Sequence, residues 1–508
     1  MKTYPITLQP DGEVHWDIAP GALRQINNFV PLQRGSYATF APHVSANKVA
    51  DYDATVYPVA GGIVRLPNDS VRAFMFNKRS IYELLSTSAA TNRSAATYSA
   101  STDTWTWTMF GDTCIATNKQ DSVQASSSGA FAALSGSPPK AKLVVSQLGF
   151  VMLLNYDDGT DTPDGWWCSQ IENPTGSWAT SLSTQAANGR LYDTPGPITA
   201  AVALRDSVIA FKADSIYVGD YIGDTANGII WGWRLVSDKV GCAAAHGVAL
   251  VNDRLYFIHR TNVYEFDGAA LRPIGDAIAH TLLRSLTATS IDGLKSVQAV
   301  VDQTNAVIIW AFDATGGDLL GECIAYNIAS GKFSQCAPLA TDSSGTSGTD
   351  FYATAVVKST QSDLVKFLGV ASDYTTTLFT GKTSASKSGI WYATYPGGAA
   401  AYNGGAVATV IAGIVGGDGV RVSRVLPRFR VFDGDDQDID PVCTIVGSKS
   451  EADIVAGAAL HIQSASWNAE EFCFDGTLQD RYVTVAMSFG GPVELSGIGL
   501  DAVASAKR

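Results

Sequence analysis

The sequence predicts an all-β protein: a degenerate β-propeller with an extended N-terminal arm and a C-terminal β-sandwich-like domain. Three observations lead to this prediction. Charged residues make up only 16% of the 508 residues, against roughly 25% in an average globular protein, while glycine is abundant at 48 residues. A hairpin-like phrase recurs along the middle of the chain. Helical spacing is almost absent, and short strands joined by turns draw on threonine, valine, aromatic residues and glycine.

Residues 1–50 are expected to form the extended arm, because prolines are spaced along this segment. The first residues contain no apolar run of the kind found in a secretory signal. We therefore expect synthesis in a cytoplasm, with any later destination reached by assembly.

Residues 51–400 contain the recurring phrase that indicates propeller blades. Each copy is an apolar run, a polar turn of two to four residues, an aliphatic residue, a tyrosine and a second strand-like run. The copies occupy residues 73–85, 208–220, 255–268 and, more loosely, 307–335, with Tyr82, Tyr217 and Tyr264 at equivalent places. Two antiparallel strands joined by a tight turn give this pattern. Blades stacked in a ring would bury both faces of each sheet, although a sandwich of the same hairpins is the alternative.

One helix is expected, at residues 276–286, where aliphatic residues keep helical spacing. Paired glycines near residue 400 mark a change in the sequence pattern, because the hairpin phrase does not recur after them. Beyond them, strict alternation over residues 482–487 predicts a half-buried strand, so residues 401–508 are expected to form a separate β domain.

Charge and cysteine content exclude several classes of function. The formal net charge of -13 does not suit a protein that grips nucleic acid by its phosphates. The seven cysteines contain no C-x-x-C pair, so neither a zinc site nor a redox motif is indicated. No apolar run approaches the ~20 residues that would span a membrane. No cofactor is expected.

Catalytic motifs fail on inspection, and we expect the protein not to be an enzyme. Gly381, Lys382 and Thr383 resemble the end of a phosphate-binding loop, but Thr376 stands where the first glycine is required. Two acidic loops could face a channel or supply oxygen ligands to a cation; their members are Asp157, Asp158 and Asp161, and Asp433, Asp435, Asp436 and Asp438. Neither follows the calcium-loop spacing, and solvated acidic turns are the simpler interpretation.

Residues 23–42, LRQINNFVPLQRGSYATFAP, resemble the opening of the tail nozzle proteins of short-tailed bacteriophages, also called tail hub or packaged-DNA-stabilising proteins. The residues at matching places are Arg24, Asn28, Phe29, Arg34 and Gly35. The family has a proline between the last arginine and glycine, and this chain lacks it.

Residues 252–276 are similar to the blade phrase of the same family. The matching residues are Tyr264, Asp267, Gly268, Arg272, Pro273 and Gly275. The resemblance implies a propeller subunit with an added β domain, assembled as a hexameric ring in the virion tail. Such a ring extends and closes the head-to-tail channel and helps to retain and release genomic DNA. Its implied partners are other copies of the chain, an adjacent adaptor ring, tail fibres or a needle or plug, and double-stranded DNA that passes through without tight binding.

A propeller that binds or cleaves carbohydrate, such as a receptor-binding or depolymerase component, is the alternative function. A glycosidase requires two carboxylates about 5 to 9.5 Å apart. Tryptophans that occur in close pairs, such as Trp105 with Trp107 and Trp231 with Trp233, could stack sugars. Packing between blades explains the same pairs, and is the interpretation that we favour.

Overall fold

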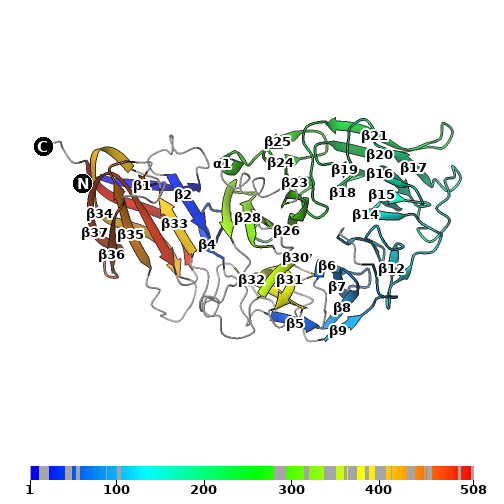
Figure 1. Cartoon of the computed structure of the whole chain (residues 1–508), viewed down its shortest axis with the longest axis horizontal. Helices are drawn as coiled ribbons and strands as arrows, with labels where there is room; N and C mark the ends of the chain where they lie inside the picture. The colour runs from blue at the N-terminus through cyan, green and yellow to red at the C-terminus, as the bar shows by residue number, and fades with distance from the viewer. Residues whose placement is uncertain are drawn as a thin grey trace.

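The computed structural model shows a chain that is almost entirely β-structure (Figure 1). It describes residues 2–10, 22–40, 48–52, 58–86, 89–99, 104–279, 293–313, 320–336, 351–359, 363, 375–383, 388–394, 408–412, 415–431, 441–450, 453–454, 460–489 and 493–504. Among these residues no helix is long and apolar enough to cross a membrane.

Six four-stranded antiparallel blades follow one another along the chain, which confirms the predicted propeller. Blade 1 contains β6 (Pro58–Arg65), β7 (Val71–Asn77), β8 (Ile81–Ser86) and β9 (Ala89–Asn92). Blade 2 contains β10 (Thr106–Phe110), β11 (Thr113–Thr117), β12 (Gln124–Ser126) and β13 (Ala132–Ala133). Blade 3 contains β14 (Lys140–Gln147), β15 (Phe150–Asp157), β16 (Asp161–Cys168) and β17 (Ala187–Arg190).

The later blades repeat this order. Blade 4 contains β18 (Ala200–Leu204), β19 (Ser207–Phe211), β20 (Ile216–Asp224) and β21 (Ile229–Ser237). Blade 5 contains β22 (Ala249–Val251), β23 (Arg254–Ile258), β24 (Val263–Phe266) and β25 (Leu271–Pro273). Blade 6 contains β26 (Gln298–Asp302), β27 (Val307–Phe312), β28 (Glu322–Asn327) and β29 (Lys332–Cys336).

A further unit, here called the closing unit, lies between blade 6 and blade 1 and completes the ring. It contains β30 (Phe351–Lys358), β31 (Thr375–Thr383), β32 (Ser388–Thr394) and, from the other end of the chain, β5 (Lys48–Tyr52). β5 pairs with β32, and β30 pairs in parallel with β6 of blade 1. The strand at the end of the predicted arm therefore belongs to the propeller.

The three tyrosines of the repeated phrase occupy the same position in their hairpins. Tyr82 lies opposite Met75, Tyr217 opposite Ala210 and Tyr264 opposite Phe257. At each turn the same backbone bond forms: the N–H groups of Asn77, Lys212 and His259 donate to the carbonyls of Ser80, Ser215 and Asn262 at 2.8, 2.9 and 3.0 Å. The phrases thus correspond to β7–β8, β19–β20 and β23–β24.

Apolar cores lie between neighbouring blades, as stacking requires. Buried residues from blades 3 and 4 form one core that includes Phe150, Trp166 and Trp231. Another joins blades 1 and 2 through Phe76, Trp105 and Phe131. Each sheet thereby covers its neighbour's face and keeps it from water.

The strands of the C-terminal β domain pair with one another in a closed circuit. Its strands are β33 (Ala408–Ala412), β34 (Val415–Val431), β35 (Val442–Ser448), β36 (His461–Asn468), β37 (Cys473–Phe489) and β38 (Val493–Ala504). The N-terminal segment adds β1 (Lys2–Pro10) and β2 (Ala22–Asn27). Pairing runs from β1 to β38, β34, β37, β33, β2 and back to β1, so these strands surround one apolar core. This domain lies beside the propeller in Figure 1.

Helical structure among the described residues comprises α1 (Asp276–Ala279), the short 3-10 helix η2 (Gly293–Ser296) and isolated helical positions at residues 363, 453 and 454. The structure therefore contains the first turn of the helix expected at residues 276–286. The remainder of that helix, and the expected domain boundary near residue 400, lie outside the described residues.

Candidate functional site

The residues of the N-terminal resemblance build a hairpin between the propeller and the C-terminal domain. β3 (Phe29–Pro31) and β4 (Tyr37–Thr39) pair with each other, and we call them the junction hairpin. Asn28 precedes it with a φ of 58°, in the left-handed region that asparagine tolerates better than most residues. Its N–H donates to Gln335 O in blade 6 and its carbonyl accepts from Phe40 N, both at 2.8 Å.

The junction hairpin bonds to the last strand of blade 6. Ser334 Oγ donates to Phe29 O at 2.5 Å, and Lys332 Nζ donates to Gly35 O at 2.8 Å. Gly35 has a φ of 79°, which favours glycine at that turn. Arg34 is exposed at the same turn, and Arg24 lies in β2.

The same hairpin packs against the C-terminal domain. The buried ring of Phe29 meets Phe489 edge to face, with 6.1 Å between the ring centroids. Ser36 Oγ donates to Glu494 Oε1 at 2.5 Å, and Val493 N donates to Thr39 Oγ1 at 3.0 Å. The resemblance residues described here thus make an architectural junction and no pocket.

The resemblance residues of blade 5 also shape the backbone. Asp267 Oδ1 accepts from the N–H groups of Ala269 and Ala270 at 2.9 and 2.7 Å, and these bonds lower the pKa of Asp267. Gly268 follows with a φ of 96°. This Asp-Gly pair therefore forms the tight turn between β24 and β25.

The Arg-Pro-Ile-Gly phrase holds the outer edge of blade 5. Arg272 Nη2 donates to Glu265 Oε2 at 2.7 Å. Pro273 lies opposite Tyr264 in the β24–β25 pairing. Gly275 N donates to Asn262 Oδ1 at 2.8 Å, and a Cβ at Gly275 would lie 2.7 Å from that oxygen, so a larger residue would force Asn262 to move.

The first acidic loop is the turn between β15 and β16. Asp157 and Asp158 accept from backbone N–H groups two residues ahead, and Asp161 pairs with Lys119 at 2.8 Å. The four aspartates of the second loop, residues 433–438, lie outside the described residues. Within the described ranges, no three His, Cys, Asp or Glu side chains converge as metal ligands.

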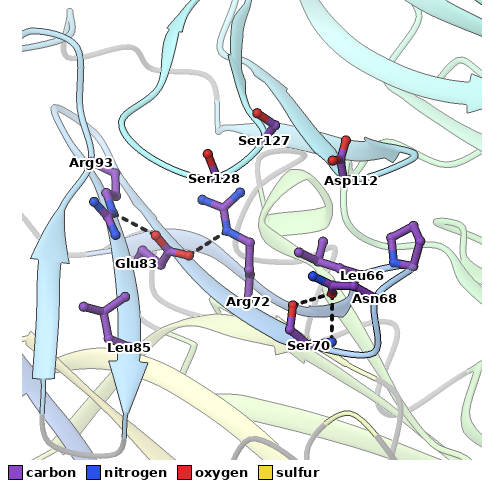
Figure 2. Close-up of a pocket in the computed structure, with 11 residues that line it drawn as sticks. Leu66, Asn68, Ser70, Arg72, Glu83, Leu85, Arg93, Asp112, Ser127 and Ser128 are labelled. Carbon is purple, nitrogen blue, oxygen red and sulfur yellow. Dashed lines mark hydrogen bonds and ion pairs between the residues drawn. The ribbon is translucent and has the colours of Figure 1, made fainter.

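A polar pocket of about 490 Å³ lies where blades 1 and 2 meet (Figure 2). Glu83 stands between two arginines, bonded to Arg72 Nε at 2.6 Å and to Arg93 Nε at 2.8 Å. Arg72 also donates to the backbone carbonyl and hydroxyl of Ser126 in blade 2, at 3.2 and 3.1 Å. Because Arg72 and Glu83 are both buried, this ion triad ties the two blades together.

A second cavity, of about 380 Å³, lies at the centre of the propeller. The strands β10, β14, β18, β22, β26 and β30 each contribute residues to its wall, so six units of the ring meet there. The indole ring of Trp107 packs directly on Gly62 of blade 1, where an added Cβ would lie 2.0 Å from that ring. A side cavity of about 130 Å³ shares Trp107, Val144, Ala201 and Lys358 with the central one.

Three ionisable groups surround this centre. Burial lowers the pKa of Lys358 to about 8 and that of His246 to about 3, while it raises the pKa of the Cys242 thiol to about 12. His246 Nε2 lies 2.8 Å from Trp105 O, which can only accept, so the neutral imidazole carries its proton on Nε2. Lys358 is consequently the charged group of the centre at neutral pH.

Neither of these two cavities combines a tryptophan with a carboxylate, the combination that the carbohydrate alternative would use. The central cavity has a tryptophan and no carboxylate, and the pocket between blades 1 and 2 has Glu83 and Asp112 but no tryptophan. Trp166 of blade 3 packs on Trp233 of blade 4 with centroids 5.8 Å apart. For these two tryptophans, the contact agrees with the interpretation of the pairs as packing between blades.

The sequence prediction missed the groups at both cavities. Glu83 interrupts the apolar strand run IYELL and Lys358 ends the run ATAVVK, and these two charges were the available signal. A charged residue inside such a run must find a partner or a cavity. Neither run contains a recognised motif.

No family model matches the chain, and no curated protein matches it. Solved structures that resemble it have very different sequences. A catalytically inactive virginiamycin B lyase from Staphylococcus aureus with quinupristin is 9% identical, with a TM-score of 0.40 over 68% of this chain and 98% of that chain. The protein YCF48 bound to D1 peptide is 10% identical, with a TM-score of 0.37 over 69% of this chain and 97% of that chain.

Proposed function

We propose that this protein is a structural subunit of a short-tailed bacteriophage virion, of the tail nozzle type. Copies of it, six by the family resemblance, would form a ring that extends and closes the DNA channel. The ring would be assembled in the host cytoplasm, dock on an adaptor ring and carry fibres or a plug. Double-stranded DNA would pass through it without tight binding.

The main support for this proposal is where the structure puts the residues that match the tail nozzle family. Asn28, Phe29 and Gly35 build the junction between the propeller and the C-terminal domain, and Asp267 and Gly268 build a blade turn. These are roles in architecture, which suits a protein whose task is to hold a shape. The propeller fold is compatible with many other tasks, so the fold alone does not decide the function.

Native mass spectrometry and negative-stain imaging of the purified full chain test the proposal. A six-fold ring with an open lumen is the expected result. A protein that stays monomeric at micromolar concentration would overturn it, as would a ring whose lumen is closed by protein along its whole length.

A further inference from the structure

The central cavity of the propeller has the character of a binding site for an anion with an apolar body. Its volume of about 380 Å³ lies within the usual range for small-molecule sites, ~300 to 1,000 Å³. Its wall is mostly apolar, with valine and alanine from successive inner strands and the ring of Trp107. Such a wall favours an apolar ligand because binding removes that surface from water.

Lys358 gives this wall a single positive charge. Among the described residues that line the two central cavities, it is the one lysine or arginine, and no aspartate or glutamate accompanies it. No hydrogen bond or ion pair joins its ammonium to any described residue. A charge placed in low-polarity surroundings without a partner is costly, and an anion in the cavity would remove that cost.

Lys358 determines which ligand charge suits the cavity, because the ionisable groups next to it are uncharged at neutral pH. Cys242 and His246 lie near enough for the lysine's charge to lower their pKa values, yet burial keeps both of them neutral around pH 7. One positive charge balances one carboxylate. A dianion such as phosphate would leave excess negative charge against the apolar wall.

We propose that the central cavity binds a small carboxylate with an apolar body, whose carboxylate pairs with Lys358. The site belongs to each propeller separately and does not depend on assembly into a ring. Lys358 provides the charge-assisted hydrogen bond, and Trp107 together with the valines and alanines of the inner strands holds the apolar part.

Octanoate is a suitable probe. Octanol is its uncharged counterpart, and inorganic phosphate is an anion that has no apolar part. Calorimetry on the full chain at pH 7 should detect octanoate binding. Octanol should bind about 10- to 100-fold more weakly, because it lacks the charge-assisted bond. Absence of octanoate binding, or phosphate that binds more tightly than octanoate, would overturn the proposal.

Lys358→Met tests the role of the charge, since methionine keeps the length of the side chain and suits an apolar wall. It should weaken octanoate about 10- to 100-fold, whereas Lys358→Arg should retain binding. Lys239→Met, at an exposed lysine, is the matched control and should bind like the wild type. Equal affinity of wild type and a folded Lys358→Met, judged by circular dichroism, would contradict the assignment.

Reductive methylation followed by peptide mass spectrometry locates the ligand independently of variants. Octanoate should slow the modification of Lys358 and leave Lys239 unaffected. Affinity should also fall as the pH rises through about 8, because Lys358 loses its proton there while Cys242 and His246 do not titrate. Unchanged labelling of Lys358 at saturating octanoate would place the ligand elsewhere.

Discussion

Glu83 lies between two arginines where blades 1 and 2 meet, and its charge holds Arg72 in a buried position. Glu83→Gln should destabilise the propeller by about 3 to 5 kcal/mol, since it leaves a buried guanidinium without its counter-charge. Denaturant unfolding followed by tryptophan fluorescence measures this loss.

Glu172→Gln is the control for that change, because Glu172 is an exposed glutamate of the same propeller. It should stay within about 0.5 kcal/mol of the wild type, as surface substitutions usually do. Equal stability of both variants would show that the triad does not hold the blades together.

Lys358 should make stability depend on pH in the alkaline range. Burial lowers its pKa from the ordinary 10.5 to about 8, so between these values the unfolded chain binds a proton that the folded chain has lost. Stability of the wild type should therefore rise with pH across this window. Lys358→Met should be the more stable protein below pH 8, with the difference shrinking toward pH 10.5. A difference that stays constant in parallel urea titrations at pH 7 and 10 would contradict this.

Residues that line the cavities were harder to predict than strands. The turn residues Asp267 and Gly268 could be recognised because their chemistry acts within a few positions of the chain. Lys358 and His246 could not be recognised, because the cavity that surrounds them is built by the inner strands of several other blades. Local sequence carries no record of that environment.

Strands of the predicted arm are elements of two different domains. β1 and β2 complete the pairing of the C-terminal domain, the junction hairpin bonds to blade 6, and β5 completes the closing unit. The prolines that suggested an extended arm do lie in extended backbone where described, as Pro5 and Pro10 are in β1. The partners of these strands are hundreds of residues away, so the pattern that predicted their shape could not predict their pairing.

Two truncations separate these roles. A chain lacking residues 1–40 should keep a protease-resistant propeller but lose resistance in the C-terminal domain, since β38 and β33 lose partners. A chain lacking residues 1–52 also loses β5 and should expose the closing unit to cleavage. Limited proteolysis with mass mapping distinguishes these outcomes. Identical fragment patterns from both truncations would argue against a separate role for β5.

Across the whole molecule, the net charge has a direct consequence for DNA. In the proposed ring, six copies at -13 each would carry a formal charge of -78, which would repel the phosphate backbone. We expect binding to a linear duplex to be weaker than the ~10⁻⁴ to 10⁻⁶ M typical of non-specific DNA-binding proteins. A gel-shift titration at low salt tests this. A complex that forms there and dissociates on adding salt would mean that a basic surface lines the path of the DNA.

The fold class was predictable because the repeated hairpins are local. Tyr82, Tyr217 and Tyr264 follow three turns that are closed by the same backbone hydrogen bond, and the composition excluded most helices. The closed pairing of the C-terminal domain was less accessible. It depends on β33 bridging β2 and β37, strands that lie at opposite ends of the chain.

The pairing of β5 with β32 dictates the order in which the protein can be completed during synthesis. β5 leaves the ribosome before any of the six blades, but its partner ends at Thr394. Until then the early strand has an unpaired edge, and the stacked blades remain an open arc. Contacts this far apart in the chain form late and leave unpaired edges open to wrong associations in the meantime. A nascent chain stalled before residue 388 should therefore aggregate more readily than one stalled just after β32 has been made.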